Sequence, residues 1–122
     1  MAKTYSKQVK GLGTTHDGLH HWTAQRLTAL ANVPLLLGTI LILLKASGKS
    51  LEAAQAFIGS PLVAAWLALT FVVAFYHASL GLQVVIEDYV SSKGLKVALL
   101  FLVRFLAALL AFVALASLVA LI

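Results

Sequence analysis

One histidine lies inside a long uncharged segment of the chain. His77 stands ten residues before Glu87, which is roughly 15 Å along a helix at 1.5 Å per residue. If this uncharged segment spans a membrane, His77 lies deep inside it. An ionisable side chain at that depth is costly, and its default interpretation is functional. A neutral imidazole there can ligate a haem iron, relay a proton or hydrogen-bond a neighbouring helix. Gly81 follows one turn later, where the missing side chain leaves room for a flat macrocycle or another helix.

The supply of ligands limits what this histidine can do within one chain. A six-coordinate b-type haem takes two axial ligands, commonly His or Met. His77 is the only histidine in a predicted span, and Met1 is the only methionine. The chain can therefore offer one ligand, and another chain would have to supply the second. The sequence has no cysteine, which excludes disulfides, thiolate metal sites, iron–sulfur clusters and covalently attached haem from this chain.

Two polar residues at the end of the same segment form a second candidate site. Asp88 lies eleven residues after His77, nearly three helical turns, so both fall on one helix face, with Tyr89 about 100° further round. A phenol beside a carboxylate can hydrogen-bond a quinone carbonyl and help to protonate it. The ordinary alternative is that the tyrosine belongs to an interfacial aromatic belt and the acid to a solvated loop.

A third cluster precedes the first apolar segment and contains His16, His20, His21, Trp22 and Arg26. Arg26 marks the cytoplasmic edge, where it could pair with a propionate or a lipid phosphate. The close histidines could suggest a metal, but metal sites usually need three or four ligands in fixed geometry. No cysteine or suitable carboxylate set accompanies them. Interfacial anchoring is the ordinary interpretation of Trp22 and of one histidine.

Arg104 is the one charge inside the last apolar segment. The sequence leaves three interpretations open for it. Its long side chain can snorkel to the nearby interface, it can pair with an acidic group such as Asp88, or it can bind an anion.

Three uncharged segments must position these residues. Apolar residues make up 61% of the 122 residues and charged residues 11%, against about 25% charged in a typical soluble domain. These values exclude a freely soluble globule and a disordered chain. The net charge is +5, but the basic residues are too scattered for a nucleic-acid surface. The uncharged runs are 27–44, 53–86 and 97–122, the last interrupted only by Arg104.

Each run supplies one bilayer-spanning helix, which needs roughly 20 mainly apolar residues. The sequence thus predicts an all-α integral membrane protein with three transmembrane helices, part of a hetero-oligomeric helical bundle. The predicted helices are about 24–45, 61–87 and 95–121, and the predicted parts are an N-terminal arm (1–23) and a transmembrane anchor domain (24–122). Residues 51–58 are expected to form a short interfacial helix.

Local signals support this division. Ser60 suits a helix N-cap and Pro61 the first helical position. Pro34 should kink the first helix, because it removes a backbone donor. The loops also predict orientation: six Lys and Arg residues belong to the N-terminal arm and the second loop, against two in the first loop. The N-terminus is therefore expected on the cytoplasmic side, with the first span as an uncleaved anchor.

These residues also resemble a known family. The pattern His77-x3-Gly81-x-Gln83-x4-Asp88-Tyr89 resembles the second-helix signature of the hydrophobic membrane anchor subunit of succinate dehydrogenase (respiratory complex II), the D-type anchor. The spacing of His20 and Arg26 resembles the N-terminal motif of that family. The resemblance covers about residues 16–122, and the three-helix layout and the length also match.

The resemblance implies roles for individual residues. His77 matches the position that supplies one axial ligand to a haem b shared with a partner chain. Tyr89 and Asp88 match the positions that bind ubiquinone. The haem propionates or the quinone pocket would be approached by Arg26 and by His20 or His21, with Trp22 at the rim of the pocket. The tandem histidines leave open which of the two carries the role.

The resemblance also implies a function in a larger assembly. It predicts the membrane anchor of a succinate:quinone oxidoreductase, which passes electrons from succinate to ubiquinone in the tricarboxylic acid cycle and respiratory chain. The chain alone would be inactive. Its expected partners are a cytochrome b membrane subunit, an iron–sulfur subunit, a flavoprotein subunit, quinone and the bilayer, without nucleic acid. The expected location is the bacterial inner membrane.

The sequence also leaves two alternative classes of function open. A non-redox structural anchor would dock soluble partner subunits without binding haem, and His77 would then bond a neighbouring helix. A small transporter or channel subunit would need polar residues along a whole pore-lining face. In this sequence the polar residues cluster near the cytoplasmic half, which disfavours the channel.

Overall fold

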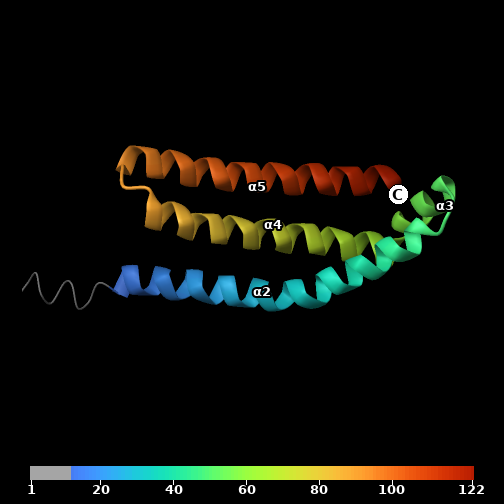
Figure 1. Cartoon of the computed structure of the whole chain (residues 1–122), viewed down its shortest axis with the longest axis horizontal. Helices are drawn as coiled ribbons and strands as arrows, with labels where there is room; N and C mark the ends of the chain where they lie inside the picture. The colour runs from blue at the N-terminus through green and yellow to red at the C-terminus, as the bar shows by residue number, and fades with distance from the viewer. Residues whose placement is uncertain (1–11) are drawn as a thin grey trace, which may run out of the picture.

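The computed structural model describes the backbone from residue 12 and the side chains from residue 18, in both cases to Ile122. This part of the chain forms four helices and no strand: α2 (Leu12–Ser47), α3 (Leu51–Ile58), α4 (Pro61–Tyr89) and α5 (Lys93–Leu121). The three long helices lie side by side in a row with α4 in the middle, and the short α3 lies at one end beside the C-terminus (Figure 1). The predicted all-α class with three spans is confirmed.

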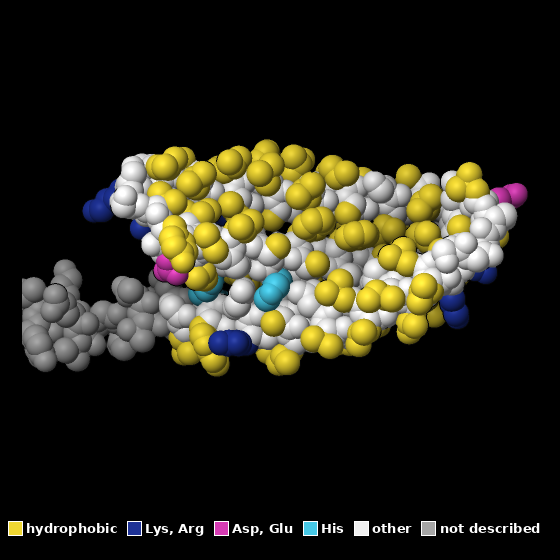
Figure 2. Space-filling view, viewed as in Figure 1, with side chains coloured by type: hydrophobic (Ala, Val, Ile, Leu, Met, Phe, Trp, Pro, Cys, Tyr) yellow, Lys and Arg dark blue, Asp and Glu magenta, His cyan; other side chains and the backbone are white. Residues whose placement is uncertain are grey.

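The long helices have the length and composition of membrane spans. The candidate spans are Gly18–Ser47, Pro61–Tyr89 and Lys93–Leu121, with mean hydropathies of 2.2, 1.8 and 2.7. Figure 2 shows hydrophobic side chains along the visible face of the long helices, and most charged side chains near the ends of the molecule. Exposed apolar surface on this scale suits contact with lipid or with other helices. The chain is a multi-pass membrane protein.

The first helix is longer than the sequence predicted. The helix begins at Leu12, whereas the predicted span begins near residue 24, so the predicted boundary at 23/24 lies within the helix. The physical reason is that residues 12–23 contain no long apolar run, and an apolar run is what indicates a membrane-spanning helix in a sequence. A helix already fixed by a membrane span extends readily into polar sequence, because each added residue gains one hydrogen bond. Residues 1–11 of the predicted arm lie outside the described part.

The other helix starts agree with the local signals. The short helix predicted at 51–58 is present as α3, and Ser50 caps it by accepting a hydrogen bond from the Ala53 amide. Ser60 is the N-cap of α4 and Pro61 its first residue, as predicted. The Ser60 hydroxyl, however, donates to the Phe57 carbonyl at 2.7 Å and does not cap α4 itself.

A glycine and a tryptophan hold α2 against α4. A side chain at Gly38 would overlap the Trp66 indole, so the bare backbone of α2 makes room for that ring. The indole Nε1 donates to the Leu35 carbonyl at 3.1 Å, and the Thr39 hydroxyl donates to Thr70 at 3.2 Å. The two helices are therefore fixed in register by both shape and hydrogen bonds.

Pro34 lies inside α2 without ending it. The helix continues to Ser47, and Figure 1 shows that its second half bends toward α3. At the same end of the molecule, the turn at Gly59 lies against the Leu121 carbonyl, and a side chain at this glycine would collide with it. The end of α5 is thereby packed onto the turn between α3 and α4.

Candidate functional site

The histidine predicted to act in the membrane has one defined partner. His77 lies on α4, is half-buried, and its Nδ1 is 2.8 Å from the hydroxyl oxygen of Thr28 on α2. The same hydroxyl donates to the Ala24 carbonyl at 2.7 Å and lies 3.1 Å from the Gln25 carbonyl. The imidazole is therefore anchored between two helices through one nitrogen.

The surrounding hydrogen bonds assign a tautomer to this imidazole. A hydroxyl has a single hydrogen, and backbone carbonyls of α2 accept the one on Thr28. Its oxygen is then free to accept from an N–H at Nδ1 of His77. On this assignment, which follows the usual optimisation of the network, Nε2 carries no proton. A metal-ligating histidine is typically held in this way, with its other ring nitrogen donating to an acceptor. The observed contacts thus fit a ligand role.

The backbone one turn beyond His77 is open. A side chain at Gly81 would meet a single atom within 4 Å among the described residues, the amide nitrogen of Gln25 at 3.7 Å. The amide oxygen of Gln25 is buried and has no hydrogen-bond partner in the described part of the chain. This side of the α2–α4 pair therefore combines a glycine gap with an unsatisfied polar atom.

The predicted quinone residues lie on the surface at the end of α4. Asp88 is exposed, and Tyr89 is 84% exposed. On α2, the Arg26 guanidinium lies over the Trp22 ring at 5.5 Å from its centroid, and both side chains are exposed. Within residues 18–122, no hydrogen bond, ion pair or ring contact joins these two pairs. A shared pocket for them would need further chains.

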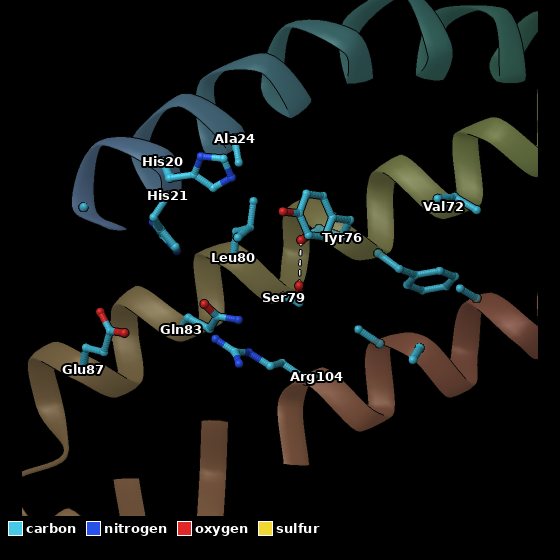
Figure 3. A pocket seen from close by; sticks show the side chains of 15 residues that line it. His20, His21, Ala24, Val72, Tyr76, Ser79, Leu80, Gln83, Glu87 and Arg104 are labelled. Carbon is cyan, nitrogen blue, oxygen red and sulfur yellow. Dashed lines mark hydrogen bonds between the residues drawn. The ribbon is translucent and has the colours of Figure 1, made fainter. Parts of the chain in front are cut away.

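A separate cavity of about 900 Å³ opens between the three long helices. Figure 3 shows its polar residues: His20 and His21 come from α2, Tyr76, Ser79, Gln83 and Glu87 from α4, and Arg104 from α5. Three alanines of α5 continue the wall: Ala107, Ala108 and Ala111. Of the predicted site residues, this cavity brings together only the tandem histidines.

Arg104 points into this cavity, toward Gln83 (Figure 3). No ion pair between Arg104 and Asp88 is found in the described part of the chain, and Asp88 does not line the cavity. The acidic group that shares the cavity with the arginine is Glu87. Of the interpretations left open by the sequence, pairing with Asp88 is thus not observed.

Comparison with known proteins identifies the family. A family model described as "Succinate dehydrogenase/Fumarate reductase transmembrane subunit" matches residues 3–119. The chain belongs to this family. The resemblance drawn from the His77-to-Tyr89 pattern is therefore confirmed for this transmembrane subunit.

Curated relatives carry a more specific name. A protein of Rickettsia bellii is 33% identical over 80% of this chain and 78% of its own length. One from Paracoccus denitrificans is 32% identical over 84% of this chain and 79% of its own. Both are named "Succinate dehydrogenase hydrophobic membrane anchor subunit". No solved structure matches this transmembrane subunit.

Sequence reasoning missed two residues of these sites. Thr28 is an ordinary hydroxyl in an apolar span, and only the register of α2 against α4 reveals it as the partner of His77. In the sequence, Gln83 was only one position of the His77-to-Tyr89 pattern and had no predicted role. In the structure it is 6% exposed and lines the wall of the cavity. The one signal in the sequence was the presence of a polar amide side chain, Gln83, within an apolar segment.

Proposed function

We propose that this chain is the membrane anchor subunit of a succinate dehydrogenase, where it helps to bind haem b and forms part of the quinone-reduction site. The observation that carries the proposal is the Thr28–His77 contact in the central part of α4, on the helix that ends in Asp88 and Tyr89. The family match and the names of the relatives support the same assignment.

His77 would hold the haem through Nε2, while Thr28 keeps the ring oriented through Nδ1. A second ligand would come from the partner cytochrome b subunit, because the other histidines, His20 and His21 among them, lie at or before the start of the first candidate span and the one methionine is Met1. Arg26, with His20 or His21, would approach the propionates from the part of α2 that precedes Thr28. When bound, a haem supplies a one-electron redox centre whose potential depends on its ligands and their hydrogen bonds.

The quinone would be reduced at the end of α4. Reduction to a quinol takes two electrons and two protons, one proton reaching each carbonyl oxygen. The electrons come from succinate through the flavoprotein and iron–sulfur subunits. The Tyr89 hydroxyl donates a hydrogen bond to one carbonyl oxygen, which favours the charge that develops there. The carboxylate of Asp88 beside it passes replacement protons inward from the aqueous phase, and the Arg26–Trp22 pair closes the rim.

The exposure of these residues supports a pocket shared with other subunits. Tyr89 is 84% exposed, and a quinone site needs walls that exclude water. The Lys and Arg distribution supports an orientation in which the N-terminus and the α4–α5 loop lie on the cytoplasmic side of a bacterial inner membrane. The soluble subunits would dock on that side and complete the pocket.

A reduced-minus-oxidised spectrum of the complex purified through this chain tests the proposal. We expect a b-type haem band that is lost or shifted in His77→Ala and retained in Thr39→Val, a control with a helix-joining hydroxyl elsewhere in α2. A band that survives His77→Ala unchanged would show that the haem is held elsewhere.

A non-redox anchor is the second candidate. The Thr28–His77 hydrogen bond joins two helices, so it can be purely structural. A native complex that contains all its subunits but no haem would favour this function. Loss of assembly in His77→Ala, without any haem in the native complex, would support it further.

A further inference from the structure

Among the residues proposed to serve the haem and the quinone, only His20 and His21 line the cavity between the three long helices. It is lined on α4 by residues spaced three or four apart, including Tyr76, Gln83 and Glu87, and not by His77, Asp88 or Tyr89. Each residue of a helix is rotated by about 100° from the previous one, so this face lies to one side of the one that carries His77. The proposed haem ligand and quinone residues therefore do not account for the side chains of Gln83, Glu87 and Arg104 in the cavity.

Two buried polar groups in the cavity wall lack a partner. Gln83 is only 6% exposed, and it makes no hydrogen bond to any residue of the described part of the chain. Nε2 of His21 is also buried and without a hydrogen-bond partner there. Buried polar groups are almost always hydrogen-bonded in native proteins. His21 Nε2 is such a buried group, and the Gln83 amide lines the cavity without a hydrogen-bond partner in the described part of the chain, so a polar ligand in the cavity would satisfy both.

The charges at the cavity have opposite signs and different depths. Glu87 lies two residues before the end of α4, about 3 Å along the axis, and Gln83 about 9 Å. Arg104 lies deeper on α5, but helical side chains lean toward the N-terminus of their helix, which returns its guanidinium toward the level of Gln83 (Figure 3). A negative group is thus outermost and a positive group lies inward of it.

The inner part of the cavity is mainly apolar, with Tyr76 and Ser79 as its hydroxyl-bearing residues, and the Ser79 hydroxyl donates to the Tyr76 carbonyl. Ala107, Ala108 and Ala111 of α5 face Val72 and Phe75 of α4 across it. This wall continues from the arginine toward the centre of the span. The cavity therefore has a polar mouth with two opposite charges and an apolar channel behind it.

We propose that this cavity binds a phospholipid whose headgroup carries a primary amine, of the phosphatidylethanolamine type. Such a lipid has its ammonium outermost, its phosphate a few ångströms inward and its acyl chains behind, which is the order of Glu87, Arg104 with Gln83, and the alanines. The phosphate accepts charge-assisted hydrogen bonds from Arg104 and a hydrogen bond from the Gln83 amide. The ammonium donates to the Glu87 carboxylate.

The carboxylate makes the choice of headgroup testable. A choline headgroup has no N–H to donate to Glu87, and an anionic headgroup would meet its negative charge. Arg104 alone would accept any phosphate. The cavity should therefore rank a primary amine above choline and above an anionic glycerol headgroup, and this ranking should depend on Glu87.

Native mass spectrometry of the whole complex, purified through this chain, tests the proposal. The detergent-solubilised complex is exposed to equimolar phosphatidylethanolamine, phosphatidylcholine and phosphatidylglycerol with identical acyl chains. We expect one phosphatidylethanolamine to be retained at energies that remove the others. Arg104→Gln should lower its occupancy by about tenfold or more, as the loss of hydrogen bonds to a charged group implies. Glu87→Gln should make the ethanolamine and choline lipids bind equally.

Two further variants guard against trivial outcomes. Lys45→Gln removes a positive charge at the far end of α2 and should leave the retained lipid unchanged. Ala108→Leu narrows the channel without altering charge, and should expel the lipid. If Arg104→Gln does not assemble, Glu87→Gln and Ala108→Leu still decide the matter.

Several results would overturn the proposal. They are a wild-type complex without retained lipid, a preference for phosphatidylglycerol, or full occupancy in Arg104→Gln. A photo-crosslinker placed at Ala108 that couples only to a partner subunit would show that a protein helix fills the cavity. The haem band, recorded on the same samples, reports on the proposed redox function independently, so failure of one idea is distinguishable from failure of the other.

Discussion

The Thr28 hydroxyl lies 2.8 Å from Nδ1 of His77 and joins α2 to α4. A single contact thus sets both the spacing of two membrane helices and the orientation of an imidazole ring. Because backbone carbonyls of α2 accept the hydroxyl hydrogen, the contact fits a ring that donates through Nδ1, and in the neutral form of that ring Nε2 is the atom with the lone pair. The consequences can be measured in variants of either residue.

Replacing Thr28 with Val should weaken haem binding without removing the ligand. Valine has nearly the same shape but cannot accept from Nδ1, so the imidazole becomes less basic. Loss of such outer-shell partners typically costs about 10–100-fold in metal affinity. We expect lower haem content and a raised midpoint potential, because a less basic ligand stabilises ferric iron less. Redox titration of Thr28→Val beside Thr39→Val measures this, and identical potentials in the two would contradict it.

Replacing Tyr89 with Phe should abolish most quinone reduction while haem and assembly remain. The substitution removes one hydroxyl from a side chain that is 84% exposed, so packing within this chain hardly changes. Removing one such donor typically costs about 10²–10³ in turnover. Succinate:quinone reductase assays of the assembled complex measure the effect. Ser91→Ala, which removes a hydroxyl from the adjoining loop, is the control, and equal turnover in both variants would exclude the role of Tyr89.

Replacing Gly38 with Ala should loosen the α2–α4 pair. The added methyl group would overlap the Trp66 indole, which must then shift and lose its hydrogen bond to the Leu35 carbonyl. Overpacking of this kind costs about 1–3 kcal/mol. A lowered melting temperature of the detergent-solubilised complex would report it. At Gly94, the added methyl group would have no neighbouring atom within 4 Å. Gly94→Ala should therefore leave the melting temperature unchanged or raise it slightly.

Replacing Gln83 with Leu should affect two quantities differently: the melting temperature of the complex without lipid, and the rise in melting temperature when lipid is added. Removal of an unpartnered buried amide is near neutral or stabilising, since leaving such a group unsatisfied costs about 1–3 kcal/mol. The delipidated complex should therefore melt at the same or a higher temperature than the wild type. Added phosphatidylethanolamine should raise its melting temperature less. A lipid response equal to that of the wild type would argue against a contact at Gln83.

The sequence was sufficient for features that depend on composition and counting. Runs without charge located the three spans, and Ser60–Pro61 marked the start of α4. The start of α2 at Leu12 escaped this reasoning, because hydropathy reports where a helix enters lipid and not where it begins. Spacing within one helix likewise placed His77 and Asp88 correctly on α4.

Contacts between residues of different helices could not be predicted from spacing along the sequence. Thr28 and His77 are 49 residues apart, and their contact depends on the register that Gly38 and Trp66 impose. The same is true of the cavity, since Arg104 on α5 faces Gln83 and Glu87 on α4. Only a packed arrangement shows that the arginine shares a cavity with Glu87.

The row arrangement of the helices bears on how the chain survives before assembly. The α2–α4 hairpin has its tryptophan and threonine contacts complete as soon as Tyr89 has been synthesised. The last helix instead buries a single residue of its own, Leu118. In a copy that meets no partner, most side chains of α5 would stay uncovered by protein. We therefore expect unassembled copies to be short-lived, so that membrane proteolysis matches the amount of this chain to that of its partners.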